Sequence, residues 1–160
     1  MPVPDKILAL VERFRDNRAD YLSAPYKEAR LRKEFIDPFF RELGWDMDNE
    51  QNYAEQYKDV IHEESIKIGN NPEAPDYCFR IGGTRKFFLE AKKPSINIKD
   101  DASPAYQLRR YAWSAKLPLS ILTDFEEFAW YDCRVKPVKT DGPATARLRY
   151  LTFDQYPDAW

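Results

Sequence analysis

Two carboxylates and a lysine lie close together in one short stretch of the chain, and together they could cleave a phosphodiester bond. Asp76 opens one expected strand, and Glu90 and Lys92 lie two residues apart on the next. Two carboxylates that face each other across adjacent strands repel unless a cation lies between them. Mg²⁺ suits that position, because it binds one or two carboxylates and keeps several waters. A metal ion with an ammonium group beside it is suited to phosphodiester hydrolysis.

A glycine-containing turn at 82–84 joins the two strands that carry these groups. Strand side chains alternate between faces, and three-residue hairpin loops with a left-handed glycine are common. With such a loop, Phe79 lies opposite Phe87 and Asp76 lies opposite Glu90. One face of the hairpin is then wholly apolar, and the other carries the charged groups. A slip of one residue would mix the two faces, so the apolar pattern itself selects this register.

The same residues resemble a known motif. Pro75-Asp76, followed by Glu90-Ala91-Lys92, resembles the PD-(D/E)xK nuclease motif. The resemblance implies that Asp76 and Glu90 hold Mg²⁺ together with the Ala91 carbonyl, and that Mn²⁺ can substitute. It also implies that Lys92 orients or deprotonates the attacking water. The short pattern occurs by chance in many charged proteins, so its weight depends on matches elsewhere in the chain.

A helix expected at 25–43 provides a second match. Its apolar positions recur every four residues, Pro38 lies inside the pattern, and Gly44 supplies a C-terminal stop. It resembles the helix that begins the nuclease domain of type I and type IIG restriction enzymes, which carries an acidic residue in its first turns. Glu28 matches that residue and would assist through metal-bound water, with Glu34 as the neighbouring alternative. A solvated glutamate near a helix N-terminus is the plainer interpretation.

The helix expected at 103–116 carries the third match. Ser103 is expected as its N-cap, with proline at the first helical position. A Gln-x-x-x-Tyr pair four residues apart shares one helix face. The same restriction families carry such a motif after the catalytic hairpin, where it is linked to DNA contact; ordinary helix surface is the alternative. The residues that the resemblance implies for DNA contact are Gln107, Arg110, Tyr111 and Lys93.

The remaining segments predict an α/β fold with a restriction-endonuclease-like core, in which helices flank a central mixed β-sheet. The sequence indicates a first helix at 4–21, a polar region at 56–68 that could hold one strand or two, and a turn at 69–72. Two buried strands at 117–124 and 127–133, a loop at 134–146 and an edge strand at 147–153 follow.

Composition excludes several classes of protein. The 160 residues, 43% hydrophobic, suit one globular domain with a sizeable core. No apolar run approaches membrane-spanning length, and the first residues do not resemble a signal peptide. Cys78 and Cys133 are expected to be reduced thiols in a cytoplasmic protein. His62, the single histidine, is expected to be a surface or strand residue and not a ligand or base. A net charge of −2 is unusual for a free-standing DNA-binding domain.

The expected function is that of a Mg²⁺-dependent DNA endonuclease, the cleavage domain of a restriction-modification enzyme. Residues 1–160 are expected to form a single nuclease domain at the front of a longer polypeptide. The expected partners are double-stranded DNA and linked or associated methyltransferase or specificity domains. A junction-resolving or repair nuclease of the same superfamily is one alternative. A non-catalytic binding module with the same fold is another, but the complete set of Asp76, Glu90 and Lys92 argues against it.

Overall fold

A mixed six-stranded sheet forms the centre of the computed structural model, which describes residues 1–160. The strand order is β1-β4-β5-β6-β7-β8. β5 and β6 run parallel, and every other neighbouring pair is antiparallel. The strands of this sheet are β1 (Val60–His62), β4 (Tyr77–Ile81), β5 (Thr84–Ala91), β6 (Leu119–Thr123), β7 (Glu127–Asp132) and β8 (Arg147–Thr152). A separate two-stranded sheet pairs β2 (Ile66–Ile68) with β3 (Asn71–Glu73), so the polar region contains separate short strands.

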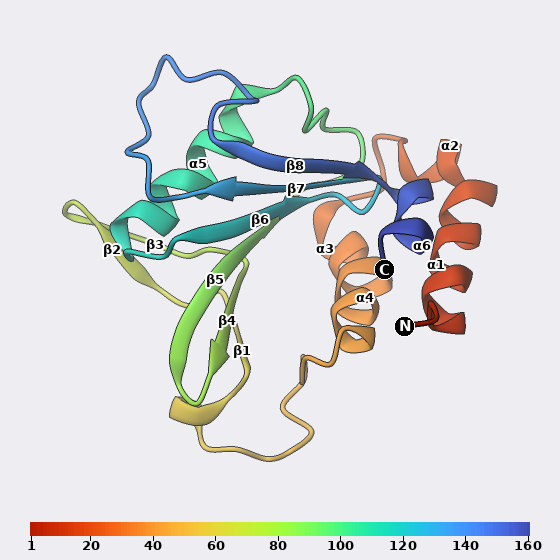
Figure 1. The fold of residues 1–160 in the computed structure, drawn as a ribbon, viewed down its shortest axis with the longest axis horizontal. Coiled ribbons are helices and arrows are strands. Elements are labelled where there is room, and N and C mark those ends of the chain that lie inside the picture. Colours follow the sequence, from red (N-terminus) through yellow and green to blue (C-terminus); the bar gives the residue numbers. More distant parts are fainter.

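Helices cover both faces of the central sheet, and the expected α/β class is confirmed (Figure 1). α5 (Ala102–Ser114) connects the parallel strands β5 and β6 across one face, as parallel pairing requires. None of the helices has the length and apolar character needed to cross a bilayer. The helices of the opposite face and the chain ends are α1 (Asp5–Asp16), α2 (Arg18–Tyr21), α3 (Glu28–Leu31), a π-helical turn (Arg32–Ile36), α4 (Asp37–Glu42) and α6 (Tyr156–Ala159), with 3₁₀ turns at Glu55–Tyr57 and Phe153–Gln155.

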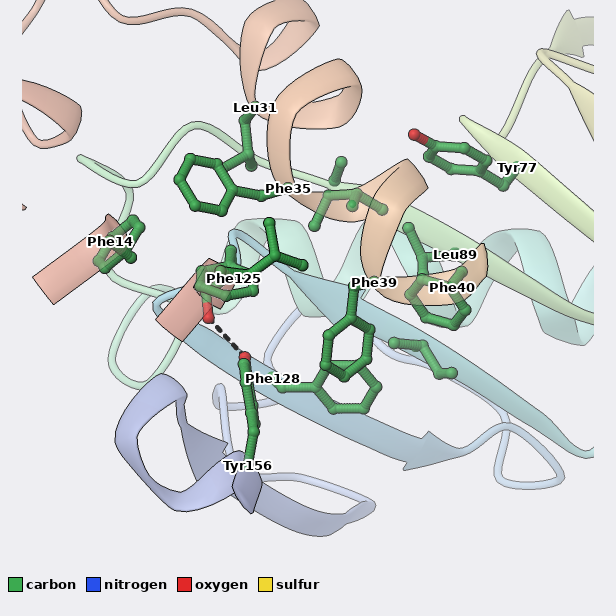
Figure 2. Close-up of a cluster of buried hydrophobic side chains, with 14 of the residues drawn as sticks. Phe14, Leu31, Phe35, Phe39, Phe40, Tyr77, Leu89, Phe125, Phe128 and Tyr156 are labelled. Atoms are coloured by element: carbon green, nitrogen blue, oxygen red, sulfur yellow. Dashed lines mark hydrogen bonds between the residues drawn. The ribbon is translucent and has the colours of Figure 1, made fainter. Parts of the chain in front are cut away.

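The larger core lies between the sheet and the N-terminal helices. Figure 2 shows its aromatic side chains, with Phe35 and Phe39 from the helical layer beside Phe125. The Phe35 and Phe125 rings lie 4.7 Å apart, and both residues are fully buried. Because Tyr77 and Leu89 of the hairpin join this core, burial of the apolar face fixes β4 and β5 against α3 and α4.

A second core lies under α5, on the face of the hairpin that was expected to be polar. Cys78 and Phe88 are fully buried there against Leu108 and Ala112 of α5. The expectation of a polar face was therefore wrong along most of its length. The physical reason is the parallel β5–β6 pair, whose crossover helix must pack on one face of the sheet and cover it.

The hairpin register is confirmed where the two carboxylates lie and is wrong beside the turn. Phe79 pairs with Phe87, as expected. The register then shifts, so that a two-residue loop joins the strands in place of the expected three-residue loop. Gly82 and Gly83 have φ values of 59° and 81°, the left-handed conformation that two-residue hairpin turns favour. At Gly83 an added Cβ would lie 2.6 Å from the Gln56 carbonyl oxygen.

The helical segments begin and end close to the expected positions, with three differences. The segment expected at 4–21 is divided at Asn17 into α1 and α2. The segment expected at 25–43 begins at Glu28 and passes through a π-helical turn before α4, in whose first turn Pro38 lies. The helical run is continuous from Glu28 to Glu42, and the π-helical turn lies just before Pro38, where the proline ring and its missing N–H disturb α-helical hydrogen bonding. At the start of α5, the N-cap is Asp101, whose side chain accepts a hydrogen bond from the Ser103 N–H, so the expected cap at Ser103 was wrong.

Candidate active site

Asp76 and Glu90 lie opposite each other at the end of the β4–β5 hairpin, next to the Tyr77–Leu89 pair. The Asp76 N–H donates to Glu90 Oε1 at 2.9 Å, and the Ala91 N–H donates to Asp76 Oδ2 at 2.8 Å. Each carboxylate is therefore held through one oxygen by a backbone N–H, and no N–H group donates a hydrogen bond to Asp76 Oδ1 or Glu90 Oε2. The arrangement fixes both groups while leaving one oxygen of each available to a ligand.

A third carboxylate reaches this pair from the helical layer. Glu28 is the first residue of α3, and its side chain lies within hydrogen-bonding reach of Asp76. Burial, reinforced by the Asp76 charge, raises the pKa of Glu28 to about 7. The alternative, Glu34, lies elsewhere: its carboxylate accepts hydrogen bonds from Arg13 at 3.1 Å and from Tyr26 at 3.0 Å. Of the two candidate glutamates, the structure brings Glu28 to the hairpin carboxylates.

Burial and repulsion also act on Glu90, which is only 3% exposed. Burial, together with the charge of Asp76, raises the pKa of the Glu90 carboxyl to about 8. The nearby Lys92 ammonium acts in the opposite direction without cancelling the effect. Carboxylates with raised pKa values that share a partly buried site are a common feature of cation and catalytic sites.

Lys92 is held in place by α5, the helix that packs on this face of the hairpin. Its ammonium donates to Gln107 Oε1 at 3.2 Å, and the Gln107 amide donates to the Tyr111 hydroxyl at 2.6 Å. The Gln-x-x-x-Tyr pair of α5 therefore contacts the lysine, and Tyr111 is only 4% exposed. Arg110 lies apart from this chain of contacts, with its guanidinium 3.6 Å from Glu73 Oε1 of β3.

A groove of about 480 Å³ opens beside these groups. Its charged lining contains four cationic side chains and two carboxylates, although the whole chain carries a net charge of −2. A second hollow of about 390 Å³, lined mainly by apolar side chains near the chain ends, contains none of the candidate residues. The residues that line the groove are Lys27, Glu28, Ala29, Arg32, Glu63, Lys92, Lys93 and Ile96.

Sequence reasoning missed Arg32, which contacts the site directly. Its Nη2 donates to the Asp76 carbonyl at 3.2 Å, and its Nη1 lies 3.7 Å from Asp76 Oδ1. The available signal was spacing: Arg32 follows Glu28 by four residues and so shares its helix face. That signal gains meaning only when Glu28 is known to face the hairpin.

The donor set fits a Mg²⁺ ion bound through two carboxylates and completed by water or substrate. Asp76 and Glu90 provide one free oxygen each, and hard cations such as Mg²⁺ prefer carboxylate oxygens. No group of three or more His, Cys, Asp or Glu side chains is arranged to hold a metal ion, so the fit rests on the two carboxylates alone.

Comparisons with known proteins place this geometry in a family context. Residues 58–139 match the family described as the type I restriction enzyme R protein N terminus. The chain is also 40% identical over 156 residues to an Escherichia coli protein, "Type II restriction enzyme and methyltransferase RM.Eco57I". That alignment covers 96% of this chain and 16% of the length of the relative. No solved structure matches the chain.

Proposed function

Because the chain belongs to the family of the type I restriction enzyme R protein N terminus, we propose that it is a Mg²⁺-dependent DNA endonuclease domain. One observation carries the proposal: Asp76 and Glu90 face each other with one free oxygen each, beside Lys92. The match covers the hairpin and α5, which are the elements that carry these groups. The excess of cations in the adjoining groove suits a phosphodiester substrate.

Asp76 and Glu90 would hold the ion, with the Ala91 carbonyl as the third protein ligand. A bound Mg²⁺ would supply Lewis-acid polarisation of the phosphate and a lowered pKa of the attacking water. Lys92, held by Gln107, would orient that water and offset the charge that develops on the phosphate. Glu28, which reaches Asp76 from α3, would assist through metal-bound water. Mn²⁺ would substitute for Mg²⁺, because it also prefers oxygen ligands.

The Gln107–Tyr111 pair of α5 would position Lys92 as well as contact DNA. Gln107 and Tyr111 form a hydrogen-bonded relay that ends on the ammonium, so their first role would be to fix the lysine. Lys93 lines the groove and is placed to contact a phosphate. Arg110 would reach DNA only after it leaves Glu73.

The domain would act as one part of a larger restriction-modification system. The Escherichia coli relative is named as a restriction enzyme and a methyltransferase, and this chain spans 16% of its length. We infer a linked or associated methyltransferase and a separate domain that recognises the DNA sequence. The two buried free cysteines, Cys78 and Cys133, suit a reducing compartment such as the cytoplasm.

Cleavage of supercoiled plasmid DNA tests the proposal. The chain is incubated with Mg²⁺, with Mn²⁺ or with EDTA, and nicked and linear products are separated on a gel. Cleavage is expected with either metal and not in EDTA. A chain that binds DNA but cleaves with neither metal would contradict the nuclease proposal and favour the non-catalytic binding module.

A further inference from the structure

The guanidinium of Arg32 lies next to the carboxylate oxygen that a metal ion would need. Asp76 Oδ2 is already bonded to the Ala91 N–H, which leaves Oδ1 without an N–H donor at hydrogen-bonding distance. Arg32 Nη1 lies 3.7 Å from that Oδ1 and 3.3 Å from Glu63 Oε1. With no metal in place, Arg32 therefore supplies a positive charge that offsets the repulsion among the carboxylates.

The Arg32 guanidinium stacks on the ring of Tyr77, which is held by its own strand, β4, and by a hydrogen bond to α4. It lies over the Tyr77 ring, with its central carbon 4.6 Å from the ring centroid. The Tyr77 hydroxyl donates to Asp37 Oδ1 at 2.6 Å, which ties β4 to the start of α4. A guanidinium stacked on an aromatic face can pivot about its stem while it keeps that contact.

Arg32 also lines the groove, so a short movement would carry its charge from the carboxylate to a substrate. The other cations of the groove are Lys27, Lys92 and Lys93. A guanidinium presents paired N–H donors that match two phosphate oxygens. Asp76 holds the guanidinium through the charge on Oδ1, at 3.7 Å, and through its carbonyl, which accepts a hydrogen bond from Nη2 at 3.2 Å.

We propose that Arg32 is a phosphate-binding residue that neutralises Asp76 in the metal-free enzyme and is released to the DNA phosphate when a divalent ion binds. The proposal rests on the nuclease function and adds a coupling to it: metal binding and phosphate binding become cooperative through one side chain. By linkage, DNA that engages Arg32 tightens metal binding by the same factor.

Binding of Mn²⁺ without DNA, measured by calorimetry, tests the first half of the proposal. Arg32→Gln removes the competing charge and is expected to tighten Mn²⁺ binding about tenfold, as expected for a unit charge near a partly exposed site. Arg32→Lys keeps the charge and is expected to bind Mn²⁺ as the unchanged chain does. Arg32→Met is a second neutral variant that preserves the packing of the stem on Tyr77, and thermal melts show which variants are folded.

Binding of a short DNA duplex tests the second half. It is measured in EDTA and at saturating Mn²⁺, in a Lys92→Ala background that is expected not to cleave. Arg32→Gln is expected to weaken binding about tenfold in Mn²⁺ and to have little effect in EDTA, where Arg32 is held by Asp76. Lys27→Gln is the matched control, because it removes a groove cation that is not paired with Asp76. This variant should weaken DNA binding equally in EDTA and in Mn²⁺.

Three outcomes would overturn the inference, and they are distinguishable. Unchanged or weaker Mn²⁺ binding by the folded neutral variants would show that Arg32 does not compete with the metal. Equal loss of DNA binding in EDTA and in Mn²⁺ would make Arg32 a simple phosphate contact with no metal-dependent release. No Mn²⁺ binding by the unchanged chain would overturn the metal-dependent function together with this inference.

Discussion

At the scale of the residue, Glu90 lies on β5 and Lys92 lies just past the end of that strand, and replacing each is expected to have a different effect on metal binding and cleavage. Glu90→Ala removes a metal ligand and should abolish Mn²⁺ binding and DNA cleavage together. Lys92→Ala should retain the metal and lose cleavage by about 10²–10⁴-fold, because its interaction is needed mainly in the transition state. Calorimetry with Mn²⁺ and plasmid nicking measure the two properties. Glu12→Ala, an exposed carboxylate on α1, is the matched control.

Full cleavage by Lys92→Ala would remove that residue from the catalytic assignment. Neither substitution is expected to unfold the chain, although Glu90 is buried on the α5 face and not on a solvated one. Glu90 is part of a group of mutually repelling carboxyls, so its loss removes an unfavourable interaction.

The titration of the same carboxyls predicts how stability depends on pH. The pKa values of Glu28 and Glu90 rise from 4.5 to about 7 and about 8 in the folded chain. Between pH 4.5 and about pH 8, the folded state binds more protons than the unfolded state. Their contribution to stability is therefore fully present below pH 4.5 and is lost as the pH rises through about 7 and about 8.

Urea denaturation of the metal-free chain at several pH values measures this effect. Glu90→Gln should flatten the decline in the free energy of unfolding between about pH 5 and about pH 9. Glu12→Gln should leave the decline unchanged. Mn²⁺ should counteract the decline, because it binds the ionised carboxylates of the folded state. An identical pH profile for the chain and for Glu90→Gln would contradict the raised pKa of Glu90.

At the scale of the element, the hairpin is stabilised unequally along its length. Phe79 is fully buried in the larger core, so Phe79→Ala should cost about 3–5 kcal/mol. Phe87 is half-buried at the edge of the same core, where its ring stacks 4.5 Å from the Phe79 ring. Phe87→Ala should cost less, because solvent already reaches part of the ring. Urea denaturation of both variants gives the comparison, and equal losses would contradict it.

At the scale of the whole molecule, the chain combines a net charge of −2 with a cationic groove. We expect weak binding of duplex DNA with little sequence preference, because phosphate contacts carry no direct sequence information. Affinity should fall steeply with salt, because each phosphate contact releases counterions. Titration of two unrelated duplexes at several salt concentrations measures both properties. Tight, sequence-specific binding at physiological salt would contradict the inferred need for a separate recognition domain.

The sequence alone determined those features whose cause is local. The apolar alternation of the two hairpin strands placed Asp76 opposite Glu90, and the structure keeps that register. The Ser103-Pro104 start signal predicted a helix where α5 lies, and helical spacing predicted the shared face of Gln107 and Tyr111. Burial of one strand face and the pitch of one helix involve neighbours in the chain, so residue order suffices to predict them.

Tertiary structure decided which residues from distant segments meet. Glu28 and Glu34 were both compatible with the helix pattern, and the packing of α3 against the hairpin brought Glu28 to the carboxylates. Arg32 meets Asp76 across 44 positions of sequence, so no local pattern could predict the contact. The buried second face of the hairpin has the same origin. Such contacts follow from how whole layers pack, and layer packing depends on every element at once.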